Sequence, residues 1–317
     1  MQLDKNKVNQ ISVSDAQSGQ RIDNFLVKHL KGVPKSHIYR LLRSGQIRVN
    51  SGRKKPHYKL QADDILRIPP VRLSESETGQ IPQSVLDTIA SAIIYEDDDI
   101  VAINKPSGFA VHKGSGLRFG IIEIFRQLRP DKELELVHRL DRDTSGCLLL
   151  AKNRKTLTLL HELLRHEKTT HIEKTYLALL DGEWQHGNRT VDIGLTKIKR
   201  SGEHLMQADA NGDRAISHFE PVEIFNKNRE DACSLVKITI ETGRTHQIRV
   251  HAQYCGHPIL GDSKYGNKQS NQRFRKLGLK RLFLHAQQLY LPLAAPITIK
   301  AALSSELDAF IQHLRAS

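Results

Sequence analysis

The stretch HRLDRDTSGCLLLAK, residues 138–152, joins a charged segment directly to an apolar one. Residues 146–151 have the composition of a buried strand, and a charged loop before such a strand can carry its side chains into a cleft. Asp141 stands between Arg139 and Arg142. Nearby cations lower the pKa of a carboxylate and keep it ionised, as a nucleophile or general base requires. Taken alone, the same pattern is more typical of a solvated loop held by ion pairs.

The sequence around this loop predicts a domain of strands and helices. Alternating or continuous apolar runs indicate strands, and a 3.6-residue period indicates helices. We expect strands over residues 92–95, 100–104, 146–151, 175–180 and 235–241, and helices over residues 119–128, 155–167, 245–254 and 304–314. These helices are too few to alternate with every strand, so the expected class is α+β, with a mixed, mainly antiparallel sheet and flanking helices.

A smaller α/β unit is predicted ahead of this domain. Residues 22–30 and 36–44 have the periodicity of two short helices, and residues 46–50 and 64–68 follow as strands. The next segment, SESETGQIPQ, is polar and acidic and lacks apolar periodicity, as expected of a linker. We therefore divide the chain into an N-terminal extension over 1–19, the small unit over 20–70, a linker over 71–90 and the larger domain over 91–317.

The charge of the chain is concentrated in the small unit. The formal net charge is +13, and residues 20–69 hold twelve basic side chains against three acidic ones. Such an excess in a short segment indicates a polyanionic partner, either nucleic acid or an anionic membrane surface. An amphipathic lysine-rich helix with bulky apolar anchors is not evident, which makes the membrane the weaker alternative.

Several other classes of protein are not supported. The first residues lack the apolar core of a signal peptide, and no uncharged apolar run approaches the roughly 20 residues that span a bilayer, so the cytoplasm is the expected location. The three cysteines stand far apart without a CxxC pair, which predicts neither a disulfide framework nor a zinc site. No phosphate-cradling glycine motif occurs, and we expect no metal and no cofactor.

A second stretch, ETGRTHQIRVHAQYCGHPILGD, residues 241–262, places Arg244, His246 and Arg249 around a predicted helix start. Arg249 could pair with a carboxylate, although an isolated helix rich in Arg and His is more often a phosphate-binding or solvated face. Tyr176, in EKTYLALL, lies on a predicted strand, where a half-buried core tyrosine is the ordinary interpretation.

Six motifs occur in a characteristic order along the chain. They are NKPSG at 104–108, HRLDRDTSG at 138–146, KTY at 174–176, GRTHQIRVH at 243–251, GHPILGD at 256–262 and LFLHA at 282–286. Together they closely resemble the RNA pseudouridine synthases that modify ribosomal large-subunit RNA, over nearly the whole chain. The N-terminal unit is similar to the S-four-type RNA-binding domain, first described in a ribosomal protein of the small subunit.

The resemblance implies an isomerase that converts specific uridines of 23S ribosomal RNA to pseudouridine. Asp141 matches the catalytic aspartate, Tyr176 the active-site tyrosine, and Arg249 the arginine that pairs with the aspartate. The carboxylate could attack the sugar, add to the base or remove a ribose proton, and all three routes remain open. The reaction requires no cofactor and no second substrate that donates a group.

Further residues are expected to hold the RNA. A uridine stacked in a helix is unreachable, so the target must be flipped into the cleft, with Arg139 contacting the vacated position. The expected substrate-binding residues are Arg139, Arg244 and His246, and those expected to grip phosphates in the N-terminal unit are Arg40, Arg43 and Lys54.

Two rival functions stay open at this point. The basic unit alone would justify only a non-catalytic RNA-binding or ribosome-assembly factor. A similar carboxylate could also cleave a base from nucleic acid, as in a glycosidase-like enzyme. The identity and number of target uridines depend on RNA shape, and transfer RNA is a possible further substrate. No protein partner is expected, and nothing demands more than a monomer.

Overall fold

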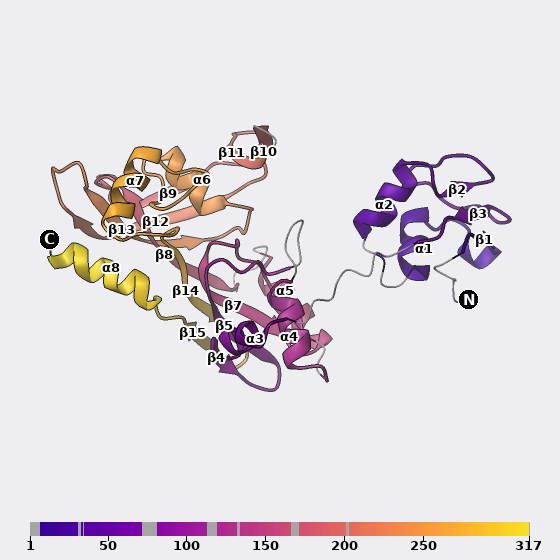
Figure 1. Ribbon diagram of the computed structural model, residues 1–317, viewed down its shortest axis with the longest axis horizontal. Helices are drawn as coiled ribbons and strands as arrows, with labels where there is room; N and C mark the ends of the chain where they lie inside the picture. The colour runs from indigo at the N-terminus through magenta and orange to yellow at the C-terminus, as the bar shows by residue number, and fades with distance from the viewer. Residues whose placement is uncertain are drawn as a thin grey trace. The chain divides into compact units, whose positions relative to one another are not determined.

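The computed structural model describes residues 7–30, 33, 35–71, 81–112, 119–131, 134–165, 171–200 and 203–316. The chain forms two compact units, Met1–Gln80 and Ile81–Ser317 (Figure 1). Within the described ranges, no helix is both long and apolar enough to cross a membrane.

The N-terminal unit packs two helices against a small antiparallel sheet. The helices are α1 (Ile22–His29) and α2 (Lys35–Arg43). The sheet has the order β1-β3-β2, built from β1 (Asn9–Ser12), β2 (Arg48–Val49) and β3 (Ile65–Ile68), and a 3-10 turn, η1, covers Asp15–Gln17. Apolar side chains from every one of these strands and α-helices meet in one core, including Ile11, Phe25, Ile38, Val49 and Leu66.

Strand β1 corrects the expectation of a plain extension over residues 1–19. It pairs with β3 from Asn9 opposite Ile68 to Ser12 opposite Ile65. Only Ile11 is buried among its four residues, so the apolar alternation is too short to indicate a strand. The strand depends on its partner rather than on its own composition.

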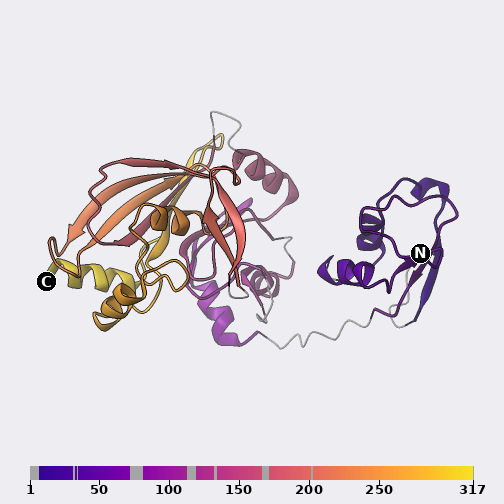
Figure 2. The same ribbon diagram turned by 90° about the horizontal axis from the view of Figure 1, so that it is seen from above.

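The second unit is built on one large sheet. Among the described residues it has ten strands in the order β4-β5-β7-β14-β8-β13-β12-β9, with β15 paired to β14 and β6 paired to β7 (Figures 1 and 2). Their bounds are β4 Ile93–Glu96, β5 Ile100–Lys105, β6 Glu135–Leu136, β7 Ser145–Ala151, β8 Glu173–Asp181, β9 Arg189–Asp192, β12 Ile216–Phe225, β13 Cys233–Ile240, β14 Leu284–Leu291 and β15 Ile297–Lys300. A separate hairpin consists of β10 (Leu195–Arg200) and β11 (Glu203–Ala208).

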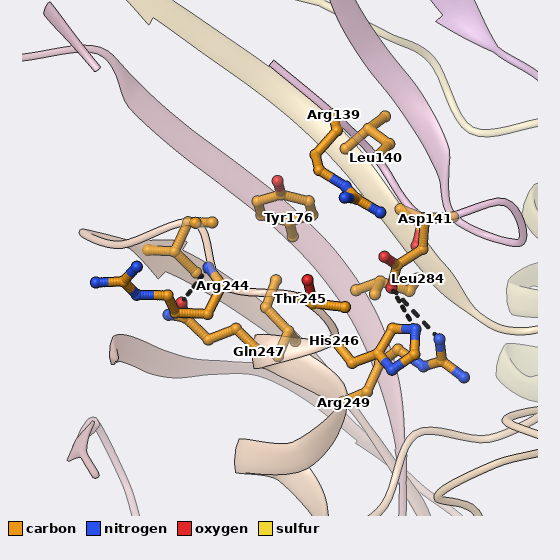
Figure 3. A pocket seen from close by; sticks show the side chains of 14 residues that line it. Arg139, Leu140, Asp141, Tyr176, Arg244, Thr245, His246, Gln247, Arg249 and Leu284 are labelled. Atoms are coloured by element: carbon orange, nitrogen blue, oxygen red, sulfur yellow. Dashed lines mark hydrogen bonds and ion pairs between the residues drawn. The ribbon is translucent and has the colours of Figure 1, made fainter. Parts of the chain in front are cut away.

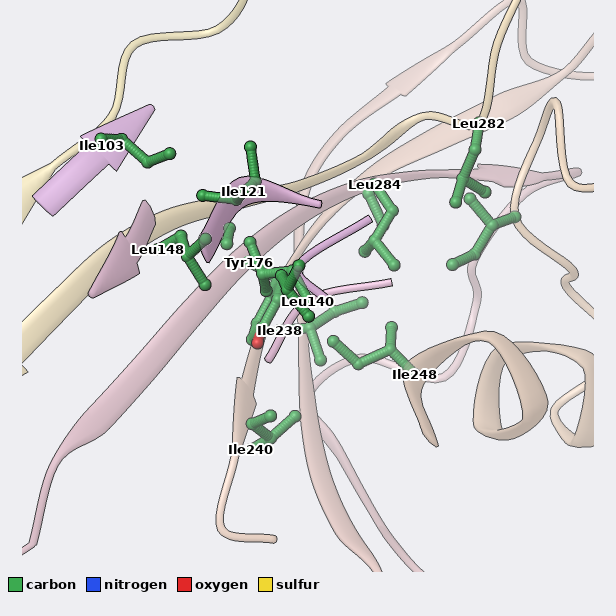
Figure 4. Close-up of a cluster of buried hydrophobic side chains, with 14 of the residues drawn as sticks. Ile103, Ile121, Leu140, Leu148, Tyr176, Ile238, Ile240, Ile248, Leu282 and Leu284 are labelled. Carbon is green, nitrogen blue, oxygen red and sulfur yellow. The ribbon is translucent and has the colours of Figure 1, made fainter. Parts of the chain in front are cut away.

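Helices cover both faces of this sheet. The helices are α3 Gln83–Ala90, α4 Ile121–Leu128, α5 Arg154–Leu163, α6 Gln247–Tyr254, α7 Lys268–Lys276 and α8 Ser305–Ala316. Side chains alternate across a strand, so on β8 Tyr176 and Ala178 join a core with α3, α4 and α6, whereas Leu177 and Leu179 join a core with α7 and α8. Figure 4 shows the first of these cores, in which Tyr176 lies among Leu140, Ile238 and Leu284.

Helix α3 corrects the C-terminal part of the expected linker, 71–90. It begins directly after Pro82, and its Leu86 and Ile89 are buried in the core of the second unit. A helix of eight residues with two buried positions gives too short a periodic signal beside an acidic, polar segment. Residues 72–80 lie outside the described ranges, and the linker there stays a prediction.

Gly146 allows the only parallel strand contact of the large sheet within the described ranges. Residues 145 and 146 of β7 pair with His285 and Ala286 of β14. Gly146 has φ +109°, and a Cβ there would lie 2.2 Å from the carbonyl oxygen of Ala286. A side chain at this position therefore meets backbone rather than a movable side chain. The contact places the loop that precedes β7 over the middle of the sheet.

We predict that Gly146→Ala destabilises the second unit by at least about 3 kcal/mol, because it adds overpacking to a strained backbone angle. Urea unfolding followed by the fluorescence of Trp184, the single tryptophan, measures this change. Gly256→Ala is the matched control, since Gly256 has φ +85° but no atom within 4 Å of the added Cβ. Equal losses of stability in the two variants would contradict the clash.

Candidate active site

Asp141 lies in the loop before β7, and the NKPSG segment, residues 104–108, forms hydrogen bonds to this loop. Lys105 is completely buried, and its Nζ donates to the carbonyl oxygens of Pro106, Phe109 and Arg142 at 2.9, 2.8 and 3.1 Å. The backbone N–H of Gly108 also donates to the Arg142 carbonyl, at 2.9 Å. These bonds fix the main chain on the C-terminal side of Asp141 and leave its carboxylate 18% exposed.

Arg249 reaches Asp141 from α6. Its Nε and Nη2 donate to the two oxygens of Asp262 at 2.7 and 2.8 Å, the parallel fork that suits a carboxylate. The remaining Nη1 donates to Oδ2 of Asp141 at 3.3 Å. The Arg249 side chain is 4% exposed and that of Asp262 is fully buried. One guanidinium thus connects a structural carboxylate to the more exposed one. Figure 3 shows its contact with Asp141.

Arg249 and Asp262 both stay charged although they are buried. Burial favours the neutral form of each group, but the hydrogen bonds and opposite charge of Asp262 outweigh it and raise the pKa of Arg249. Burial likewise raises the pKa of Asp262, yet the bonds from Arg249 and from the backbone N–H groups of Lys264 and Tyr265 leave it below 3.8. Arg249 therefore presents a permanent positive charge to Asp141.

His246 is the second neighbour of the Asp141 carboxylate. Its Nε2 lies 3.8 Å from Oδ2 of Asp141, and its Nδ1 lies 2.7 Å from the hydroxyl of Tyr265. His246 caps the start of α6 in a left-handed conformation, with φ 56° and ψ 18°, which is strained for a residue with a side chain. Buried Gln247 anchors this turn, since its Nε2 donates to the Ile216 carbonyl at 2.8 Å and its Oε1 accepts from Thr242 at 2.7 Å.

The pocket beside these groups has an apolar wall. Burial and the charge of Asp141 raise the pKa of Tyr176, so its hydroxyl stays protonated. The residues that line the pocket are Arg139, Leu140, Asp141, Thr144, Tyr176, Ile240, Gly243, Arg244, Thr245, His246, Gln247, Ile248, Arg249 and Leu284. A carboxylate and a fixed guanidinium next to a buried aromatic ring and aliphatic side chains can hold a flat, uncharged ring and act on it in a water-poor space.

The structure brings together six of the residues expected from the sequence: Asp141, Tyr176, Arg249, Arg139, Arg244 and His246 all line this pocket. Arg139 is exposed and extends between Tyr176 and Asp141 in Figure 3. Arg244 lies across the pocket from Asp141, and its Nε donates to the Arg214 carbonyl at 3.0 Å.

The expected source of charge beside Asp141 was partly wrong. Arg142 pairs with Asp143 at 3.0 Å instead of with Asp141. The positive charge comes from Arg249, which is distant in sequence. Proximity along the chain indicated an arginine beside Asp141, but the arginine that contacts it is Arg249 and not Arg142.

Three residues of the site have no counterpart among the expected functional residues: Asp262, Gln247 and Tyr265. Asp262 ends the GHPILGD motif, and a buried-type segment that ends in an aspartate is a signal that could have found it. The sequence carries no comparable signal for Tyr265, since its role depends on a turn that returns to α6. Among the described residues, no group of three or more His, Cys, Asp or Glu side chains could hold a metal ion.

The basic residues predicted to grip RNA lie on the surface of the N-terminal unit. Arg40 and Arg43 are exposed on α2, and Lys54 is half-buried with its Nζ 4.5 Å from the centre of the Tyr58 ring. None of the three has a carboxylate partner among the ion pairs of the described residues. Their charges are available to an anion.

Comparisons with known proteins agree with this geometry. A sequence profile described as RNA pseudouridylate synthase matches residues 99–254, and one described as the S4 domain matches residues 20–66. The chain is 49% identical over 315 residues to the ribosomal large subunit pseudouridine synthase C of Pasteurella multocida, which covers 97% of this chain and 94% of that protein. The chain belongs to the RNA pseudouridylate synthase family. The protein of the same name from Haemophilus influenzae is 47% identical over 317 residues, covering 98% and 96%.

Solved structures of the pseudouridylate synthase family share the fold. Human RNA Pseudouridylate Synthase Domain Containing 4 superimposes with a TM-score of 0.60 at 25% identity, over 73% of this chain and 96% of that one. Human RNA Pseudouridylate Synthase Domain Containing 1 gives 0.55 at 25% identity, over 71% and 95%. The expected family, the α+β class, the S4-type unit and the activity of an RNA pseudouridine synthase are confirmed.

We predict that Asp262→Asn costs about 3–5 kcal/mol of stability, because it leaves the Arg249 charge buried without a counterion. The folded pKa of Asp262 lies below its ordinary value of 3.8, so its contribution is complete above that pH and is lost as pH falls through the folded pKa. Urea unfolding at a series of pH values from 7 down to about 2, followed by Trp184 fluorescence, should show a larger acid-dependent loss in the wild type than in the variant, in which carboxylates such as Glu96 and Asp97 still lose their contributions.

Glu230→Gln is the matched control for Asp262→Asn. Glu230 also pairs with an arginine, Arg273 at 3.0 Å, but its side chain is 87% exposed. A surface pair of this kind contributes at most about 1 kcal/mol. A similar cost for both substitutions would contradict a special role for the buried pair.

Proposed function

We propose that this pseudouridine synthase isomerises specific uridines of large-subunit (23S) ribosomal RNA, with Asp141 as the catalytic residue. The observation that carries the residue assignment is the fixed Arg249. Two of its guanidinium nitrogens donate to Asp262, and the third, Nη1, donates to Asp141 in a pocket with an apolar wall. The substrate class follows from the relatives, which are named as ribosomal large subunit pseudouridine synthases.

The reaction rearranges bonds within one nucleotide. The bond between C1′ of ribose and N1 of uracil breaks, the base turns, C1′ bonds to C5, and the C5 proton leaves while N1 gains one. Attack on the sugar, addition to the base and removal of a ribose proton all start from an ionised Asp141. Arg249 would orient this carboxylate, which is the contribution expected of a preorganised site. No redox step or added group is involved.

Tyr176 would contact the uracil ring from the buried side of the pocket. Its hydroxyl remains protonated because burial and the charge of Asp141 raise its pKa. It can therefore stack on the base or pass a proton, and it cannot serve as a phenolate base at neutral pH. The aliphatic side chains around it would exclude water, which otherwise could hydrolyse the separated sugar and base.

Arg139, Arg244 and His246 are proposed to bind the substrate. The target uridine must leave its stack to reach Asp141, and the exposed Arg139 stands at the side of the pocket where it could fill the vacated position. Arg244, across the pocket, would contact the backbone of the flipped nucleotide. The S4-type unit would hold RNA through Arg40, Arg43 and Lys54. We further propose that the enzyme acts in the cytoplasm as a monomer without a protein partner.

We predict that the wild type releases tritium to water from large-subunit ribosomal RNA labelled on C5 of uracil, because C5 becomes the glycosidic carbon. Asp141→Asn keeps the shape of the side chain but loses the charge, and should be slower by on the order of 10³-fold or more. Asp143→Asn, in the same loop but paired with Arg142 at the surface, should retain activity.

Other outcomes of the tritium assay identify the rival functions. Binding of RNA without any release by the wild type would favour a non-catalytic assembly factor. Release of free uracil from the same RNA would favour a glycosidase-like enzyme. Undiminished release by Asp141→Asn would overturn the assignment of the catalytic residue while leaving the reaction established.

We predict that Arg40→Glu and Arg43→Glu each weaken RNA binding and lower the slope of log Kd against log salt by about 1, because each lost phosphate contact releases one counterion fewer. Lys54→Glu should act alike. The rate at saturating RNA should not change. Lys28→Glu, an exposed basic residue on α1, is the control in the same unit. If the salt dependence of RNA binding were the same in all four variants and in the wild type, Arg40, Arg43 and Lys54 would not be phosphate contacts.

A further inference from the structure

Tyr265 joins three parts of the active site. It is 4% exposed, and its backbone N–H donates to Oδ1 of Asp262 at 3.0 Å. The centre of its ring lies 5.0 Å from Cζ of Arg249, a cation-π distance. Its hydroxyl lies 2.7 Å from Nδ1 of His246 and accepts the backbone N–H of Met206 at 2.9 Å. No other residue described in the structure contacts Asp262, Arg249 and His246 in these ways at once.

The surroundings of this hydroxyl determine where the protons lie. The backbone N–H of Met206 can only donate, so Nδ1 of His246 is the acceptor available to the phenolic proton of Tyr265 among the described contacts. If Nδ1 of His246 accepts that proton, Nε2 carries the ring N–H. Nε2 is the atom that faces Oδ2 of Asp141 at 3.8 Å. The opposite tautomer would turn a lone pair toward a carboxylate, which is unfavourable.

The ring of His246 is best described as neutral. Burial and the charge of Arg249 lower its pKa, and the charge of Asp141 opposes them without reversing the direction. Lys264 lowers the pKa further and Asp262 raises it. A neutral ring has two tautomers, and the choice between them is open to a single hydrogen bond. Tyr265 makes that bond.

We propose that Tyr265 is a positioning residue that sets the tautomer and the orientation of His246, so that its Nε2–H faces the carboxylate of Asp141. Both His246 and Arg249 approach the same oxygen, Oδ2. Oδ1 of Asp141 has no partner among the contacts of the described residues and is the oxygen left for the uridine. This inference rests on the proposed catalytic role of Asp141.

The hairpin β10–β11 takes part in this arrangement. Met206 belongs to β11, and Leu205, Met206 and Ala208 pack against the cluster that contains Tyr265. Lys264 also pairs with Glu203 of the hairpin at 3.2 Å. A hairpin that moved away would remove the Met206 bond and with it the reason for the phenolic proton to point at His246. The tautomer of His246 therefore depends on where the hairpin lies.

Tyr265→Phe tests the proposal because it keeps the ring and removes only the hydroxyl. We expect kcat to fall about 10-fold in the tritium assay, equivalent to about 1.4 kcal/mol, with KM for RNA and the melting temperature little changed. His246→Asn should cost more, and asparagine tolerates the left-handed backbone at this position. If Tyr265 acts through His246, the double variant is no slower than His246→Asn alone. Independent, additive losses would overturn the proposal.

The tautomer can be observed directly. Protein labelled with ¹⁵N-histidine gives separate Nδ1 and Nε2 signals in long-range ¹H–¹⁵N spectra, and those of His246 are identified by their loss in His246→Asn. We expect a protonated Nε2 and an unprotonated Nδ1 in the wild type, and a shift toward the other tautomer in Tyr265→Phe. A protonated Nδ1 in the neutral wild-type ring, or an identical spectrum in Tyr265→Phe, would refute the inference.

Two further variants separate this inference from the proposed function. Tyr95→Phe removes another hydrogen-bonded hydroxyl, which donates to Asp97 at 2.8 Å outside the pocket, and should leave kcat unchanged. Asp141→Asn should be inactive. If Asp141→Asn is inactive while Tyr265→Phe is fully active, only the role of Tyr265 fails. If Asp141→Asn is fully active, both the catalytic role of Asp141 and the role of Tyr265 that rests on it are wrong.

Discussion

The buried fork between Arg249 and Asp262 is the constraint on which the rest of the site depends. A guanidinium that is 4% exposed is stable in this place only because a fully buried carboxylate neutralises it with two short bonds. The fork uses two of the three guanidinium nitrogens and leaves Nη1 in one direction, toward Asp141. The buried pair thus gives the guanidinium a fixed orientation toward the carboxylate of Asp141.

The sheet explains how residues so distant in sequence come to surround one pocket. Strand β14 lies between β7 and β8, and it pairs in parallel with the first residues of β7 and antiparallel with β8. The loop that carries Asp141 therefore ends one strand away from β8, with Ala286 of β14 paired to Gly146 on one side and to Tyr176 on the other. Helix α6 follows β13 on the same face, and Gln247 binds its first turn to β12. Each contributing segment is short, and rigid elements support every one of them.

Much of this arrangement was predictable from the sequence, for reasons that differ between residues. The apolar run of β7 and the periodicity of α6 are local signals, and the motifs around Asp141, Tyr176 and Arg249 correctly indicated that these residues share a site. Arg142 shows the limit of local reasoning, because it flanks Asp141 in the sequence but pairs with Asp143, whereas the arginine that contacts Asp141 is the distant Arg249. Strand β1 and helix α3 have too few buried positions to be periodic, and Tyr265 gains its role only from the turn that follows Asp262.

The position of β14 has a consequence for the order in which the two units fold and become active during synthesis. This strand, Leu284–Leu291, is synthesised late, yet it is the strand that joins the Asp141 side of the sheet to the Tyr176 side. The two halves of the catalytic sheet, β4-β5-β7 and β8-β13-β12-β9, cannot be joined until β14 has been made, whereas the N-terminal unit has its whole core by residue 71. A nascent chain would hold a folded RNA-binding unit long before it could carry out any chemistry, so attachment to RNA and activity are separated in time during synthesis.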